Sequence, residues 1–127
     1  MTQPQIPDPS IPREDCKLIS CVLPDDGSDK KLLQALLHEK QITRTKSVSC
    51  LGLAVLAEAR TKYGELPEPA MVRLVEVIVP AALADELYDY IYHKANIARA
   101  GGGTLLLGPL MAASPHALPD DVPDEKA

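Results

Sequence analysis

The sequence has little of what nucleic-acid-binding or membrane-spanning proteins need. Its 127 residues carry 13 Lys and Arg against 18 Asp and Glu, a net charge of −5, so it lacks the basic surface that nucleic acid requires. No apolar run reaches the roughly 20 residues of a membrane span, and the polar, proline-rich start is unlike a secretory signal. These features predict a cytoplasmic protein, and the length favours a single domain.

Cysteine and catalytic groups are also scarce. Cys16, Cys21 and Cys50 form no Cys-x-x-Cys motif and no mixed Cys and His ligand set, which argues against a zinc site and against a disulfide framework. We predict that Cys21 is a small core residue of a strand. No nucleophile with a neighbouring base is visible in the sequence, so we do not expect an enzyme.

Proline and acidic residues gather at the two ends of the chain. We expect residues 1–15 to form a disordered, proline-rich arm and residues 111–127 to form an acidic, proline-rich tail. The body between them, residues 16–110, has enough apolar residues for one hydrophobic core.

Hydrophobic periodicity in the body predicts four strands and two helices. The strands are expected at residues 17–23, 42–53, 71–80 and 104–107, and the helices at residues 29–41 and 82–99. The order βαββαβ is that of the ferredoxin-like α+β fold, an antiparallel four-stranded sheet with both helices on one face. Three of the strands are apolar on both sides, which predicts that the second face of the sheet is buried against further copies of the chain.

Two segments exceed what this fold needs. Gly101–Gly103 is a glycine triplet, whereas the end of a helix needs only one glycine. The triplet indicates a loop whose backbone N–H groups are open to an anion. The alternative is a flexible turn. Residues 53–70 join two strands that a hairpin could join with about two to five residues. Long loops are usually functional, although a simple two-stranded ribbon would also account for this one.

Taken together, the order of elements, the long loop, the "VEVIVP" strand followed by a helix, and the glycine loop resemble the PII signal-transduction superfamily, specifically its divergent PII-like members. The resemblance covers residues 17–107 approximately. It implies a regulatory homotrimer whose sheets face inward, with an adenine nucleotide in the clefts between subunits. It also implies a T-loop at residues 53–70 that binds a regulated target, such as a membrane transporter for inorganic carbon, with bicarbonate as a further effector.

The resemblance assigns residues to the nucleotide site one by one. Gly101 and Gly103 match the two glycines of the family's phosphate-binding loop, and Gly102 replaces an acidic residue. Thr104 stands where the family has a phosphate-binding Lys, which leaves Arg99 as the nearby cation. Because so little positive charge remains, the sequence favours AMP or ADP over ATP.

The resemblance also assigns residues to the long loop. Cys50, Leu51 and Gly52 lie at its base, where the family has Gly-x-Gly, and Gly52 is expected to join the nucleotide site. The residues expected to contact the partner protein are Arg60, Lys62 and Tyr63.

Two other classes of protein fit the same order of elements. One is a CutA-like or other ferredoxin-like oligomer that binds a metal ion or a small molecule. A metal ion would need clustered His, Cys or carboxylate ligands, and the sequence has none at a recognised spacing. The other is a structural trimer without a ligand.

Overall fold

The computed structural model describes residues 6, 8–53, 69–99 and 101–115. Its elements follow the predicted order and are β1 (Glu14–Pro24), α1 (Ser28–Lys40), β2 (Thr45–Leu53), β3 (Pro69–Pro80), the short 3-10 helix η1 (Ala81–Leu83), α2 (Ala84–Lys94) and β4 (Thr104–Ala113). The predicted ferredoxin-like α+β fold is confirmed. None of the helices in these ranges is long and apolar enough to cross a membrane.

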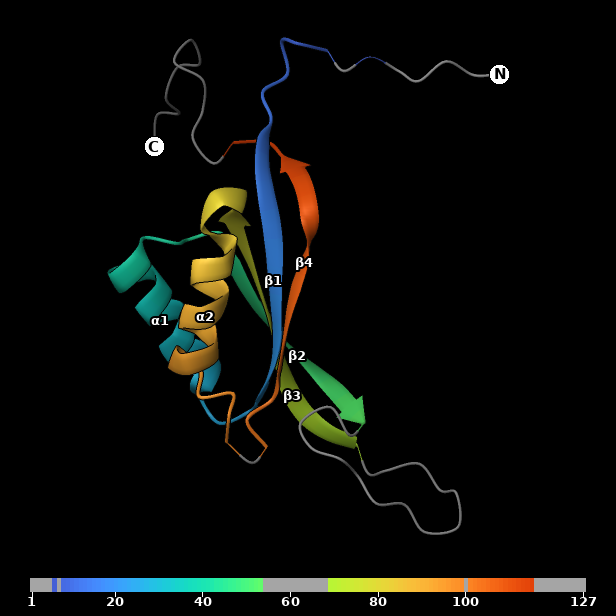
Figure 1. Cartoon of the computed structure of the whole chain (residues 1–127). Helices are drawn as coiled ribbons and strands as arrows, with labels where there is room; N and C mark the ends of the chain where they lie inside the picture. Colours follow the sequence, from blue (N-terminus) through green and yellow to red (C-terminus); the bar gives the residue numbers. More distant parts are fainter. Residues whose placement is uncertain (1–5, 7, 54–68, 100, 116–127) are drawn as a thin grey trace, which may run out of the picture.

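The four strands form one antiparallel sheet in the order β2-β3-β1-β4. Both helices lie on the same side of this sheet (Figure 1). The register pairs Leu18 of β1 with Ile78 of β3, and Lys46 of β2 with Glu76 of β3. Because side chains alternate between the two sides of a strand, these pairs fix which residues share a face.

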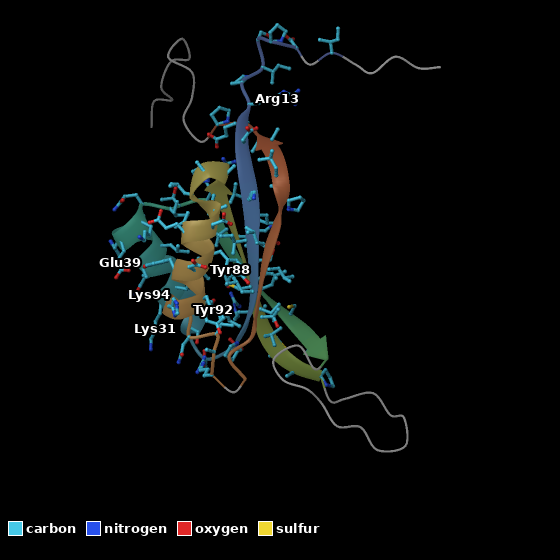
Figure 2. The ribbon with its side chains drawn as sticks, in the orientation of Figure 1. Arg13, Lys31, Glu39, Tyr88, Tyr92 and Lys94 are labelled. Carbon is cyan, nitrogen blue, oxygen red and sulfur yellow. The ribbon has the colours of Figure 1, made fainter. Side chains whose placement is uncertain are left out.

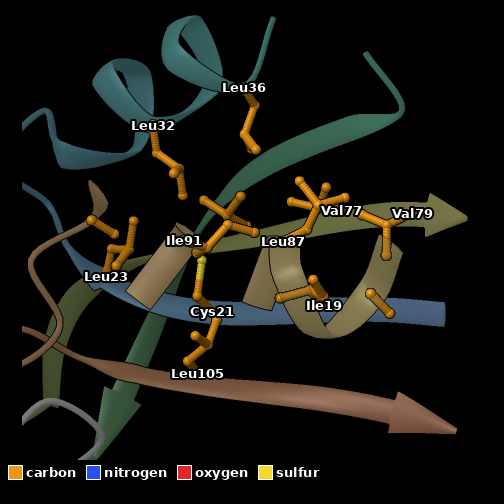
Figure 3. Packing of buried hydrophobic residues seen from close by; sticks show 13 residues of the cluster. Ile19, Cys21, Leu23, Leu32, Leu36, Val77, Val79, Leu87, Ile91 and Leu105 are labelled. Atoms are coloured by element: carbon orange, nitrogen blue, oxygen red, sulfur yellow. The ribbon is translucent and has the colours of Figure 1, made fainter. Parts of the chain in front are cut away.

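The hydrophobic core lies between the helices and the sheet (Figure 3). Leu32 and Leu36 of α1 are four residues apart, as are Leu87 and Ile91 of α2, so each pair faces the sheet from one side of its helix. The strand residues that meet them are Ile19, Cys21, Leu23, Val75, Val77, Val79 and Leu105. Cys21 is fully buried, which confirms its predicted place in the core.

Neither α1 nor α2 covers the opposite side of the sheet (Figure 1), and this side, here called the open face, carries apolar side chains in the described strands. Val48 of β2 and Leu106 of β4 are 44% and 60% exposed. The half-buried side chains beside them on this face are Leu18, Val22, Leu74 and Ile78. Strands β1, β3 and β4 thus carry apolar side chains on this face as well, as predicted, beside the polar residues Ser20, Lys46 and Glu76.

Candidate functional site

The glycine triplet forms the turn between α2 and β4. Gly101 and Gly103 have φ angles of 68° and 107°, a left-handed conformation that side chains disfavour. A Cβ atom on Gly103 would lie 1.9 Å from the backbone oxygen of Val22, and one on Gly102 would lie 2.6 Å from that of Ile97. All three positions thus have a structural reason to be glycine, as expected if the triplet is a turn and not an anion-binding loop.

Arg99, the cation expected beside a phosphate, is bonded within the protein. Its Nη2 donates to Asp26 Oδ2 and to Ser28 Oγ, each at 3.0 Å. The pKa of Asp26 is lowered to about 2, chiefly by the hydrogen bond from the Ser28 hydroxyl and further by Arg99, against the opposing effect of burial. The arginine therefore ties the turn before β4 to the loop before α1.

The predicted nucleotide residues fall into two groups in the subunit. Thr104 begins β4 beside Val22, next to the glycine turn, whereas Cys50, Leu51 and Gly52 lie near the end of β2. Strands β2 and β4 are the two edges of the sheet, so the groups are roughly 14 Å apart across three strand spacings. One subunit does not bring them together, and their contact with a ligand stays a prediction.

The predicted partner-binding residues Arg60, Lys62 and Tyr63 lie outside the described residues, as does most of the long loop. The arm and the tail are described in part. Strand β1 already begins at Glu14, and β4 continues to Ala113, so both reach beyond the strand limits expected from sequence.

A polar cluster joins α1 to the sheet and was missed by sequence reasoning. Asp29, at the start of α1, is only 4% exposed. Its Oδ2 accepts a hydrogen bond of 2.8 Å from the Ser47 hydroxyl and one of 3.0 Å from Arg73 Nε, and Arg73 Nε also lies 3.2 Å from Ser47 Oγ. Burial would raise the pKa of Asp29, but these hydrogen bonds outweigh it and lower the pKa below its ordinary value. The cluster therefore attaches α1 to β2 and β3 on the helix side of the sheet.

A second ionic pair joins the helices on their outer surface. Lys94 Nζ of α2 donates to Glu39 Oε1 of α1 at 2.9 Å, and Tyr90 Oη donates to the other oxygen of Glu39. Figure 2 shows Glu39 and Lys94 next to each other at the surface of the two helices, away from the sheet. This pair stabilises the helix layer and does not face the open face.

A hollow of about 320 Å³ lies on the open face, where β3 is paired with β1 on one side and with the start of β2 on the other. Leu18 and Ile78 form an apolar floor, and Lys46 and Glu76 lie beside them. Lys46 Nζ is 3.6 Å from Glu76 Oε1, and the two side chains are 65% and 26% exposed. The rest of the lining comes from the short segment 43–45.

The hollow combines apolar surface with two basic side chains, Lys46 and Arg44, and one carboxylate, Glu76, which suits a small molecule more than a metal ion. Arg44, at its rim, is held by Glu14, with Nη1 and Oε1 2.7 Å apart. In the part of the chain that the structure describes, no group of three or more His, Cys, Asp or Glu residues could hold a metal ion.

The fold and the open face define the chain as a ferredoxin-like α+β protein. Among solved structures it is similar to CutA from Synechococcus elongatus PCC7942, with 11% identity and a TM-score of 0.52 over 80% of this chain and 77% of that one. It is also similar to CutA1 from Pyrococcus horikoshii, with 14% identity and a TM-score of 0.51 over 83% of this chain and 88% of that one. At these identities the likeness concerns the fold. The sequence matches no protein-family model and no curated protein.

These neighbours correct the family inferred from sequence. The prediction of a PII-like protein that senses AMP or ADP and signals to a target is wrong, because the two solved structures described above, which share the fold, are CutA proteins. The features behind the resemblance have another origin here: the order of elements belongs to the ferredoxin-like plan, and the glycines are required by the turn. Of the alternatives, the CutA-like or other ferredoxin-like oligomer is the one whose fold these neighbours share.

Proposed function

We propose that the chain is a CutA-like homotrimer that binds a small molecule where its subunits meet. The open face is the observation that supports this proposal. A lone subunit would otherwise leave the apolar side chains of Val48 and Leu106 in contact with water on this face. The fold shared with CutA and the hollow at the end of the same face add to the support.

The energy of assembly comes from the side chains of the open face. Moving an exposed Val or Leu side chain completely out of water contributes about 1.5–3 kcal/mol. Val48 and Leu106 lie on the two edge strands, with half-buried apolar residues on the strands between them, so the whole width of the sheet can contribute. A stable interface needs roughly 1,000 Å² or more of buried surface, which a four-stranded sheet face can supply.

A threefold arrangement covers more of this surface than a twofold one. In a cyclic trimer each sheet meets two neighbours, and its edge strands β2 and β4 come next to edge strands of the adjacent subunits. A twofold pair of sheets would cover the open face but would leave both edges with unpaired backbone groups. The trimer therefore accounts for the open face and the open edges together.

Sedimentation velocity at micromolar concentration tests the assembly. The unmodified chain should sediment as a trimer, and Val48→Glu and Leu106→Glu should sediment as monomers, because each places a carboxylate in the proposed interface. Leu83→Glu is the matched control, since Leu83 is 44% exposed, like Val48, but lies in η1. Circular dichroism confirms that the variants are folded. A monomeric parent chain, or trimers of both open-face variants, would contradict the proposal.

A further inference from the structure

The hollow on the open face is built from two cross-strand pairs that lie side by side. Leu18 is paired with Ile78, and Lys46 is paired with Glu76. Ile78 and Glu76 are two residues apart on β3, so both point to the open face in adjacent rows. An apolar pair thus lies directly beside an ion pair, and a volume of about 320 Å³ is at the lower end of the range for small-molecule sites.

The ion pair in the hollow is loosely held. At 3.6 Å, the distance between Lys46 Nζ and Glu76 Oε1 is longer than a hydrogen bond. Arg44 is bonded more closely to Glu14, at 2.7 Å, and Arg73 to Asp29, at 3.0 Å, whereas the exposed pair of Lys40 and Glu86 is similarly loose at 3.7 Å. The ammonium of Lys46 and the carboxylate of Glu76 are therefore available to groups of a ligand.

We propose that this hollow binds a small amphiphilic zwitterion, of the class of α-amino acids with an apolar side chain. The ligand carboxylate would accept from Lys46, its ammonium would donate to Glu76, and its side chain would lie on Leu18 and Ile78. A ligand with a single charge pairs with only one of the two protein charges and leaves the other one desolvated without a partner. A zwitterion satisfies both with charge-assisted hydrogen bonds.

The hollow also connects this ligand to assembly. It opens onto the face that the proposed trimer covers, so an adjacent subunit would close it and exclude water, which strengthens the charge pairs. In this respect the inference rests on the proposed function, for which it names the class of ligand. The hollow lies toward the end of the sheet opposite the glycine turn. Val22 pairs with Thr104 beside that turn, whereas Cys16, near Leu18 of the hollow, pairs with Met111 toward the other end.

Isothermal titration calorimetry of the full chain with L-leucine tests the proposal. Three further probes remove one feature each: 4-methylpentanoate lacks the ammonium, 3-methylbutylamine lacks the carboxylate, and glycine lacks the side chain. L-leucine should bind at least tenfold more tightly than each of these, about 1.4 kcal/mol. Equal affinity for L-leucine and its single-charge analogues, or no binding of L-leucine at millimolar concentration, would overturn the proposal.

Variants place the binding in the hollow. Lys46→Met and Glu76→Gln should each weaken L-leucine binding tenfold or more, since each removes one charge of the pair. Lys30→Met is the matched control, because Lys30 is exposed on α1, away from the open face. Unchanged affinity in both hollow variants would show that the ligand binds elsewhere and would refute the assignment.

Sedimentation of the same samples separates the two proposals. A trimer that does not bind L-leucine overturns the ligand class and leaves the assembly intact. A monomer that binds L-leucine through Lys46 and Glu76 overturns the assembly and supports the site.

Discussion

Replacing single glycines of the turn before β4 gives a direct test of why they are there. Gly101→Ala and Gly103→Ala make the same chemical change, two positions apart, at residues with φ angles of 68° and 107°. A left-handed conformation costs an alanine roughly 1–2 kcal/mol, and this term is common to both variants. The environments differ, because a Cβ on Gly101 meets nothing within 4 Å.

At Gly103 the new Cβ would lie 1.9 Å from the backbone oxygen of Val22, so the turn or the strand has to move by about 1.5 Å before the contact reaches the ordinary van der Waals range, which begins at 3.4 Å. Val22 is in β1 and pairs with Thr104 at the start of β4. Movement there weakens one or two backbone hydrogen bonds, each with a net contribution of about 0.5–1.5 kcal/mol. We expect Gly101→Ala to lower the free energy of unfolding by about 1–2 kcal/mol, and Gly103→Ala by about 2–5 kcal/mol.

Urea unfolding followed by circular dichroism measures both values. All samples need the same protein concentration, because the stability of an oligomer depends on it. If the two variants unfold at the same urea concentration, close packing is not the reason for Gly103 and our explanation of the triplet fails.

Three further predictions concern single side chains. Asp29→Ala should destabilise the fold by about 3 kcal/mol at neutral pH, since it leaves buried partners unpaired. Because the pKa of Asp29 is lowered in the folded state, its carboxylate stabilises the fold above about pH 4. This stabilisation should fade in urea titrations as the pH falls through the folded-state pKa. Burial and the bond to Glu39 raise the pKa of Tyr90 to about 12, so Tyr90→Phe should remove the latest phenol transition in an absorbance titration, and an unchanged curve would contradict this contact. Iodoacetamide should label half-buried Cys50 before Cys21, whose pKa burial raises to about 12; peptide mass spectrometry showing equal labelling would be the opposing result.

Much of the fold could be predicted because its periodicity is local. The spacing of Leu32 and Leu36 indicates the buried side of a helix, and the run of β-branched residues in β3 indicates a strand. The extent of β4 could not be predicted in this way. Gly108 and Pro109 indicate a stop in the sequence, but β4 is an edge strand, where a proline and a shift of register are tolerated, and pairing with β1 resumes at Leu110.

The candidate site was harder to predict, because its residues meet through register and not through spacing. Arg73 and Glu76 are the polar residues of an otherwise apolar strand, and that exception was the available signal. Their partners depend on which residue of β2 lies opposite, and on where α1 places Asp29. A one-residue slip of β2 would have exchanged the faces on which Lys46 and Ser47 lie.

The central position of β1 has a consequence for how the chain folds. The first strand to be synthesised pairs with the third and the fourth, so that Glu14 lies opposite Ala113. Bringing such distant segments together closes large loops before any pairing is gained, which makes folding slow compared with helical proteins of this size. On the ribosome, one edge of β1 stays unpaired until β3 has emerged, and the other edge stays unpaired until β4 has emerged. Ribosome-bound chains that end before β4 are therefore the species in which aggregation and chaperone binding should be sought.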